Sequence, residues 1–127
     1  MPLTHIHVRA GRSDDERGAL LAAVHRALVA ALRIPADDRN LVLHEHAPAC
    51  FSTHRGPDVV LIEVTLFAGR SGAAKRALYT ALVAELGGLG VRREAITTVL
   101  HEVPREHWGI RGGQCAADVD LGFVVEV

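Results

Sequence analysis

The tetrapeptide AGRS occurs twice in the chain, at residues 10–13 and again at residues 68–71. A second short match, LHE, occurs at residues 43–45 and at residues 100–102. The copies are offset by 58 residues (10 to 68) and by 57 residues (43 to 100), so the matches stay in register. Matches at a fixed offset indicate a duplicated supersecondary unit. We therefore interpret the chain as two tandem copies of one fold element.

Each copy contains two segments that favour β-strands. Residues 3–9 (LTHIHVR) alternate between apolar and polar side chains, and residues 59–67 (VVLIEVTLF) are rich in β-branched and apolar residues. Residues 40–46 (NLVLHEH) and 96–103 (ITTVLHEV) have the same character. One strand thus precedes and one follows each AGRS region.

A helix is predicted after each AGRS. Ser13 followed by Glu16 forms a capping box, in which each side chain satisfies a free backbone N–H at the helix start. The glycines of residues 87–90 (GGLG) are suited to end the second helix. Leucine and valine residues at helical spacing predict the buried stripes: Leu21, Val24, Leu28 and Leu32 in the first helix, and Leu78, Leu82 and Leu86 in the second.

These elements predict an α/β domain spanning residues 1–127, built from two βαβ repeats at about 2–46 and 59–103 with a tail at 104–127. Right-handed βαβ crossovers place both helices on one face of a four-stranded mixed sheet, with parallel strands inside each unit. The opposite sheet face is then uncovered and apolar, so we expect an oligomer. The final apolar stretch, residues 122–127 (GFVVEV), could add an edge strand to its own or a neighbouring subunit.

Composition excludes several classes of function. The net charge of -1, without a basic stripe, disfavours nucleic acid as a partner. The sequence shows neither a secretory signal nor eighteen consecutive apolar residues, so we expect a cytoplasmic protein without a membrane span. Cys50 and Cys115 lack the CxxC spacing of metal or redox sites, and we expect ordinary thiols. His44 and His46 share a strand face, but with His54, His101, His107 and Cys50 they match no metal motif, so no metal is expected.

The duplication also predicts where chemistry could occur. If the two first strands lie side by side and antiparallel, Pro2 lies near Arg70, and the parallel strand at 40–46 brings Asp38 to the same corner. Removal of Met1 would give Pro2 a free secondary amine, and burial beside a cation would lower its pKa toward neutrality. Arg70, placed before a helix, could bind a carboxylate or an oxyanion. Val60 is the counterpart of Pro2, so only one corner should be active.

These residues resemble the tautomerase superfamily, whose members carry an amino-terminal catalytic proline on a βαβ repeat. The long, duplicated form resembles malonate semialdehyde decarboxylase and its homotrimeric relatives over nearly the whole chain. The motifs that carry the resemblance are Pro2, PADDR (35–39) with Asp38, GRS with Arg70, and HWGIRGGQ (107–114).

The resemblance implies an apolar wall of the active site containing Trp108 and Ile110, and a substrate contact at His25, which is followed by Arg26 as in the dehalogenase relatives. It implies no cofactor. Two departures affect the substrate. Ala68 stands where the decarboxylase has a second arginine, and Phe67 and Val99 stand where the dehalogenase has an arginine and a tyrosine.

The resulting hypothesis is keto-enol tautomerisation of a small 2-oxo acid such as phenylpyruvate, by a homotrimer. Decarboxylation or hydration of a three-carbon oxo acid, as in malonate semialdehyde chemistry, is a second hypothesis. A third is a non-catalytic trimeric binding protein on the same scaffold. The catalytic hypotheses all require removal of Met1, because Pro2 has a free amine only at the start of the mature chain.

Overall fold

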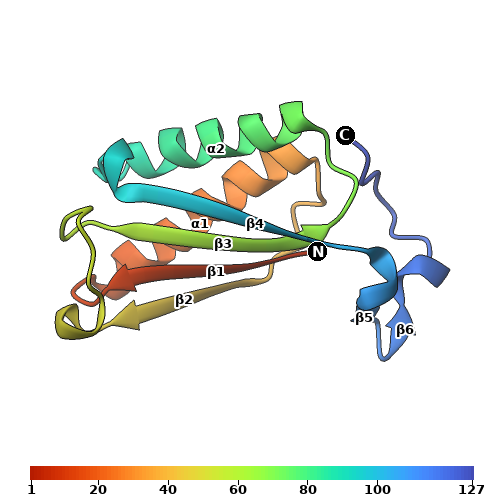
Figure 1. Ribbon diagram of the computed structural model, residues 1–127, viewed down its shortest axis with the longest axis horizontal. Helices are drawn as coiled ribbons and strands as arrows, with labels where there is room; N and C mark the ends of the chain where they lie inside the picture. Colours follow the sequence, from red (N-terminus) through yellow and green to blue (C-terminus); the bar gives the residue numbers. More distant parts are fainter.

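The computed structural model describes residues 1–127, and it contains the two βαβ units that the repeat predicts (Figure 1). A short hairpin and a tail without regular structure follow them. The helices and strands are β1 (Pro2–Arg9), α1 (Asp14–Leu32), β2 (Leu41–His46), β3 (Val60–Phe67), α2 (Gly72–Gly87), β4 (Ile96–Val103), β5 (Gly109–Ile110) and β6 (Gln114–Cys115). Single turns of 3-10 helix lie at Pro48–Cys50, Arg93–Ala95, Arg105–His107 and Ala116–Asp118.

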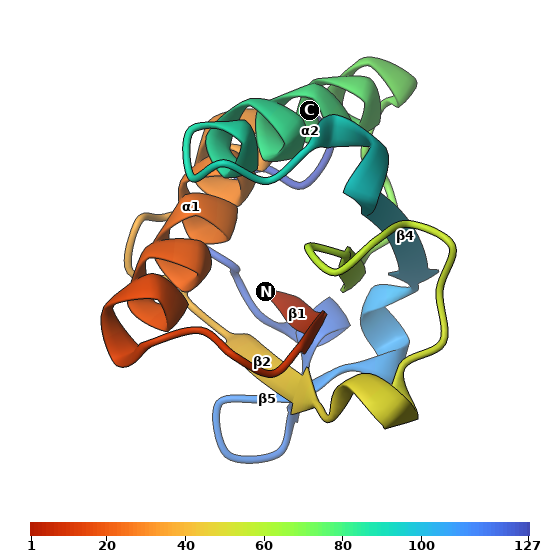
Figure 2. The same ribbon diagram turned by 90° about the vertical axis from the view of Figure 1, so that its left-hand side faces the viewer.

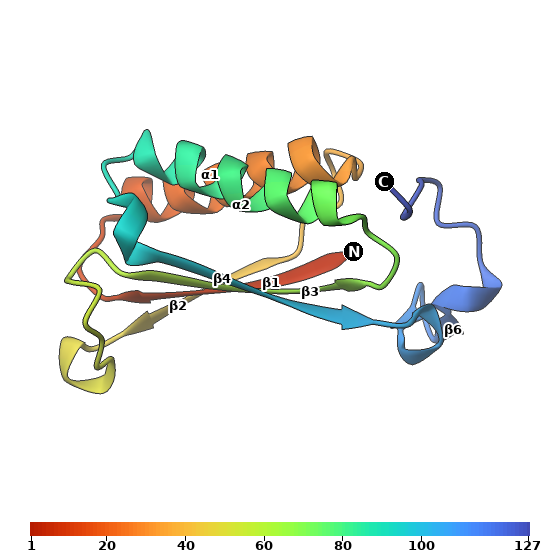
Figure 3. The same cartoon turned by 45° about the horizontal axis from the view of Figure 1, so that its top comes forward.

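The main sheet has the strand order β2-β1-β3-β4. The strands are parallel within each unit and antiparallel between β1 and β3, where Pro2 lies opposite Leu66. Both helices cover the same face of this sheet, as the end-on view and the tilted view show (Figures 2 and 3). The predicted mixed sheet with two helices on one face is therefore confirmed. The register also confirms that strand β1 begins beside the end of β3.

Serine caps start both helices. Ser13 and Glu16 form the predicted capping box, and the Ser71 hydroxyl accepts a hydrogen bond from the backbone N–H of Ala74. The buried stripe of α1 differs from the prediction by one position, because Leu20 is buried and Leu21 is only partly buried. Leucine positions 20 and 21 both lie near the 3.6-residue stripe, so spacing alone does not choose between them. The predicted stripe of α2 is confirmed.

The core lies between the helices and the sheet. Every second residue of the central strands points into it, and fully burying such a side chain contributes about 1.5–3 kcal/mol. The fully buried apolar strand residues of this core are Ile6, Val8, Val60, Ile62, Val64 and Leu66, and they pack against buried residues of both helices. No helix combines the length and the hydropathy needed to cross a bilayer.

The opposite sheet face carries a column of histidine rings. His5 and His7 of β1 stack on His44 of β2 with ring centroids 5.0 and 4.6 Å apart, and His7 also stacks on His46. His5 Nδ1 lies 2.7 Å from His44 Nε2. Glu63 of β3 adds the carboxylate of this face, 3.3 Å from His7 Nε2. The histidine rings therefore lie close together on a sheet face that remains partly exposed.

The chain after β4 crosses the end of the sheet where the N-terminus lies (Figure 1). Residues 119–127 form no strand, so the tail adds none to its own sheet. Val125 is instead buried beside Phe67, and the carbonyl of Val127 accepts a hydrogen bond from the Ser71 N–H at the start of α2. The tail is therefore held by a small apolar cluster and by this hydrogen bond, which satisfies an N–H group that has no partner within the helix.

Candidate active site

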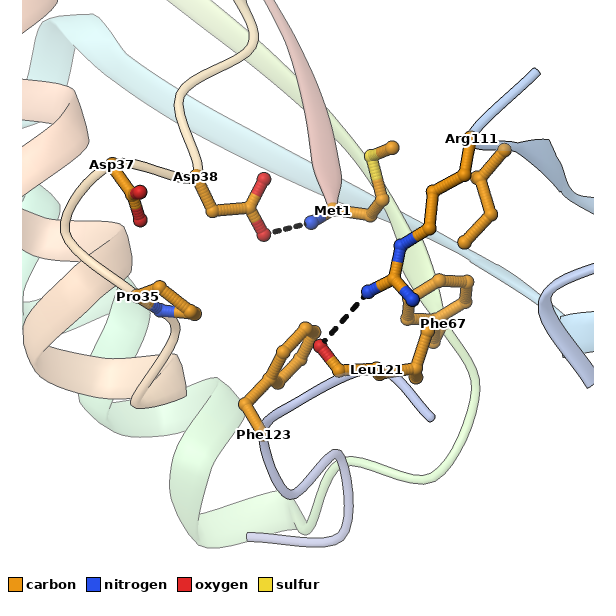
Figure 4. A pocket seen from close by; sticks show the side chains of 9 residues that line it. Met1, Pro35, Asp37, Asp38, Phe67, Arg111, Leu121 and Phe123 are labelled. Atoms are coloured by element: carbon orange, nitrogen blue, oxygen red, sulfur yellow. Dashed lines mark hydrogen bonds and ion pairs between the residues drawn. The ribbon is translucent and has the colours of Figure 1, made fainter. Parts of the chain in front are cut away.

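A pocket of about 230 Å³ opens beside the first residues of β1 (Figure 4). Its polar groups come from the chain terminus, from the turn before β2 and from the β5–β6 hairpin. The polar lining residues are Asp37, Asp38 and Arg111. The remaining lining residues are Met1, Pro35, Phe67, Ile110, Leu121 and Phe123. The pocket therefore pairs an apolar wall with a few convergent charges, as small-molecule sites do.

Asp38 reaches the chain terminus, as the repeat predicts. The amino group of Met1 donates to Asp38 Oδ2 and forms an ion pair with it (Figure 4). Pro2 is buried and begins strand β1 opposite Leu66. The turn that carries Asp38 is closed by a hydrogen bond from its own N–H to the carbonyl of Pro35. The Asp38 carboxylate therefore contacts the residue that immediately precedes Pro2.

Arg70 lies behind this pocket and does not line it. Its side chain is 5% exposed, and Nη1 donates to the carbonyl of Leu32, the last residue of α1, at 2.5 Å. The guanidinium carbon lies 5.9 Å from the ring centroid of Phe123, which is a wall residue of the pocket. Nε and Nη2 have no hydrogen-bond partner. Burial lowers the pKa of Arg70, although the charge of Glu126 opposes that change.

Ile110 lines the pocket, whereas His25 and Trp108 lie behind residues that line it. His25 is buried in α1, and its Nε2–H donates to the carbonyl of Ala36 at 2.7 Å. His25 therefore supports the turn that holds Asp38. Trp108 packs against Phe67 with ring centroids 4.8 Å apart and donates its Nε1–H to the carbonyl of Val103. It supports the apolar wall from behind.

Comparisons with known proteins identify the group to which this chain is related. Two family profiles, each described as "Tautomerase enzyme", match residues 38–111 and residues 2–53. The first match alone spans more than half of the chain. The chain belongs to the tautomerase family.

Individual relatives of the tautomerase family match most of the chain. Probable tautomerase YusQ of Bacillus subtilis (strain 168) is 27% identical over 122 residues, which are 90% of this chain and 96% of the relative. A crystal structure of FG41 malonate semialdehyde decarboxylase inhibited by 3-bromopropiolate is 32% identical, with a TM-score of 0.82 over 89% of this chain and 92% of that chain. A fused 4-OT symmetric trimer is 28% identical, with a TM-score of 0.81 over 91% of this chain and 96% of that chain.

The pocket residues that the sequence did not single out include Phe67, Phe123 and Arg111. Phe67 and Phe123 form the aromatic part of the wall, and Arg111 supplies the cation that faces the cavity (Figure 4). Arg111 lies inside the HWGIRGGQ motif, immediately before two glycines, and an arginine in so tight a turn is a signal that could have identified it. The two phenylalanines have no such signal, because an apolar residue at a strand end or in a tail is usually part of a core.

The duplicated corner, at the start of β3, differs in its chemistry. Asp58 precedes β3 there, and Arg92 binds its two carboxylate oxygens at 2.7 and 3.2 Å. Hydrogen bonds from the Arg92 side chain lower the pKa of Asp58 to about 2. Val60 begins the strand in mid-chain, so this corner contains an ion pair and no amine.

Proposed function

We propose that this protein is an enzyme that moves a proton at the carbon next to a carbonyl group, with a small 2-oxo acid such as phenylpyruvate as its substrate. The observation that carries this proposal is the ion pair between the amino group of Met1, next to Pro2, and Asp38 in a pocket with an apolar wall. An amine and a carboxylate within reach of one bound molecule are the groups that proton transfer requires.

The proposed base is Pro2 after removal of Met1. Loss of Met1 would convert the Pro2 nitrogen from an amide into a secondary amine, and would vacate the part of the pocket that Met1 now lines. Pro2 is buried, and burial disfavours the charged form of an amine. The neutral amine then accepts the proton from carbon, and the same nitrogen returns a proton to the other end of the enolate.

Charge changes in this reaction can be balanced by neighbouring groups. When Pro2 takes the proton it becomes a cation, and Asp38, which pairs with the amino group of Met1, would stabilise it. The enolate oxygen becomes negative, and Arg70 is the proposed group that binds it, since its Nε and Nη2 have no acceptor. The Phe123 ring stands over the guanidinium, so this contact forms when the ring moves aside. Phe67 and Ile110, with Trp108 behind them, would keep water from the enolate.

Decarboxylation or hydration of a three-carbon oxo acid is the second candidate function. It is favoured by the 32% identity to a structure of malonate semialdehyde decarboxylase. Asp38 would then position water or substrate. Carbon dioxide release from malonate semialdehyde at a rate comparable with enol ketonisation would favour this function over tautomerisation.

The proposed assembly is a homotrimer that packs through the histidine-bearing sheet face. This face is not covered by a helix, and Leu3, Val42 and Val99 on it are 37%, 42% and 41% exposed. Trimers occur among the structural neighbours of similar sequence. Burying those side chains between subunits would remove apolar surface from water.

Two measurements test the proposed function. Intact mass spectrometry should show a mature chain that begins at Pro2, and a chain that keeps Met1 would favour a binding protein on the same scaffold. Phenylpyruvate enol ketonisation should then fall by about 100-fold or more in Pro2→Ala, the scale of a lost general base. Pro57→Ala, an exposed proline remote from the pocket, is the matched control. Undiminished activity in Pro2→Ala would overturn the proposal.

A further inference from the structure

Arg111 occupies a backbone position that does not suit arginine. It lies in the turn between β5 and β6, where the N–H of Gly113 donates to the carbonyl of Ile110 at 3.1 Å. The register pairs Ile110 with Gln114, so the loop has three residues, and Arg111, Gly112 and Gly113 have φ angles of 49°, 79° and 99°. A positive φ suits glycine or asparagine, because a larger side chain crowds its own backbone there. An arginine there is strained, and such strain is concentrated at functional sites.

The charge of Arg111 is not neutralised within the protein. Its Nη1 donates to the carbonyl of Asp120 at 2.8 Å, and its Nη2 donates to the carbonyl of Leu121 at 3.4 Å. Arg111 takes part in none of the ion pairs of the structure, which are formed by other arginines, Lys75, two histidines and the amino group of Met1. Backbone carbonyls therefore fix the direction of the guanidinium while its positive charge and its remaining N–H donors stay free.

The free cation faces the pocket. The Arg111 side chain extends between Met1 and Phe67 toward the cavity, and Asp38 lies across the pocket on the far side of Met1 (Figure 4). An anion bound in the pocket would meet Arg111 on one side and the amine of the mature chain on the other. A guanidinium held in a fixed orientation binds a planar carboxylate through two parallel hydrogen bonds.

We propose that Arg111 binds the carboxylate of the substrate and makes the pocket selective for oxo acids over neutral carbonyl compounds. This inference rests on the proposed function for the identity of the pocket, but the binding step that it describes does not require turnover. Arg111 takes the carboxylate from the open side of the pocket, whereas the proposed partner of Arg70 is the enolate oxygen. The two arginines thus act on different ends of one substrate.

The turn geometry allows the binding role of Arg111 to be tested without damage to the fold. Arg111→Asn places a residue that tolerates positive φ at this position, but it also loses the hydrogen bonds to the carbonyls of Asp120 and Leu121, so the midpoint of thermal unfolding should change little. The KM for phenylpyruvate should rise by about 10- to 100-fold with kcat little changed, which is the scale of a lost charge-assisted hydrogen bond. The methyl ester of phenylpyruvate should be turned over equally well by both proteins. Arg111→Lys should recover part of the affinity.

Binding without turnover separates this inference from the proposed function. Calorimetric titration of the mature protein with 3-phenylpropionate, an unreactive carboxylate, should show binding that Arg111→Asn weakens and that Pro2→Ala largely keeps. Arg93→Asn, which removes an exposed arginine paired with Glu94, is the matched control and should bind like the unmodified protein. If phenylpyruvate is not turned over at all, the proposed function fails while this binding result still stands.

Any of four outcomes would overturn the assignment. The first three are an unchanged affinity for 3-phenylpropionate in Arg111→Asn, an equal loss in Arg93→Asn, and an equal effect of Arg111→Asn on the acid and on its ester. A fall in the unfolding midpoint of Arg111→Asn together with an unchanged KM would likewise show that the arginine is part of the turn and not of the binding site.

Discussion

Met1 and Asp38, 37 positions apart in the sequence, form an ion pair through the amino group of Met1 and Oδ2 of Asp38. Two parallel strands bring them together. Strand β1 starts at Pro2 and β2 starts at Leu41, and both starts lie at the same end of the sheet because Thr4 is paired with Leu41. The N–H of Thr4 also donates to the carbonyl of Asn40 at 3.0 Å, which fixes the end of the Asp38 turn against β1. The carboxylate is therefore placed by the sheet itself.

Replacing Asp38 with asparagine should lower the kcat for phenylpyruvate by about 10- to 100-fold, because the protonated amine loses its counter-charge. Removing that carboxylate also disfavours the protonated amine, so the apparent pKa of the acid limb of kcat/KM should fall. Steady-state rates across the pH range measure both effects. Asp37→Asn removes the adjacent carboxylate, which also lines the pocket, and should leave the acid limb in place. An unshifted limb in Asp38→Asn would argue against the amine-carboxylate pair.

His25→Ala should destabilise the protein by about 1–3 kcal/mol, since the variant removes a buried side chain together with its hydrogen bond to the carbonyl of Ala36. Urea unfolding followed by circular dichroism measures this free energy. The turn at residues 35–39 would also loosen, so the rate of enol ketonisation should fall more than the KM rises. His54→Ala, at an exposed histidine, should change stability by less than about 0.5 kcal/mol. Equal stabilities for the two variants would contradict the role of His25 as a support of the turn.

Acid should destabilise the protein through the histidine column. Burial is the main cause that lowers the pKa of His44 below 6.5, followed by the nearby charges of His7, His5 and His46. A histidine with a lowered pKa in the folded state takes up its proton more readily when the chain unfolds. Its contribution is fully present above pH 6.5 and is lost as the pH falls below that value. Glu63 is the carboxylate that opposes this trend.

Urea unfolding at several pH values from about 5 to about 8 measures this dependence. His44→Gln should flatten the fall in unfolding free energy below pH 6.5, because glutamine does not titrate. His54→Gln, away from the column, should leave the fall unchanged. A steeper pH dependence in His44→Gln than in the unmodified protein would show that protonation of His44 does not destabilise the fold.

Val99→Glu should weaken the proposed trimer, because it places a charge on the exposed sheet face of β4. Light scattering during gel filtration should give about 41 kDa for the unmodified protein, three times the 13.6 kDa of one chain, and a smaller mass for the variant. Thr80→Glu adds the same charge to the exposed side of α2 and should keep the larger mass. A single-chain mass for the unmodified protein would exclude the trimer.

Most of the fold could be predicted from the internal repeat. Matching AGRS and LHE tags located both units, and residue patterns then placed the four strands within one residue of their observed bounds. The Ser13 cap located the start of α1, and the glycines at residues 87–90 located the end of α2. The antiparallel pairing of β1 with β3 could also be predicted, because a two-fold relation between like units requires it. Leu21 was predicted as a stripe residue in place of Leu20, because hydrophobic periodicity does not separate neighbouring positions at the edge of a helix stripe.

What the sequence determined by itself was the pair of βαβ units, and with them the corner that joins Pro2 to Asp38, since short crossovers leave a duplicated chain few ways to fold. Only the tertiary structure decided the rest of the pocket. The chain after β4 has no periodic pattern, and burial of Val125 against Phe67 fixes its course. That course puts Phe123 over Arg70 and Arg111 into the cavity. Contacts between such distant segments have no local signal, because they depend on which apolar side chains meet once the sheet has formed.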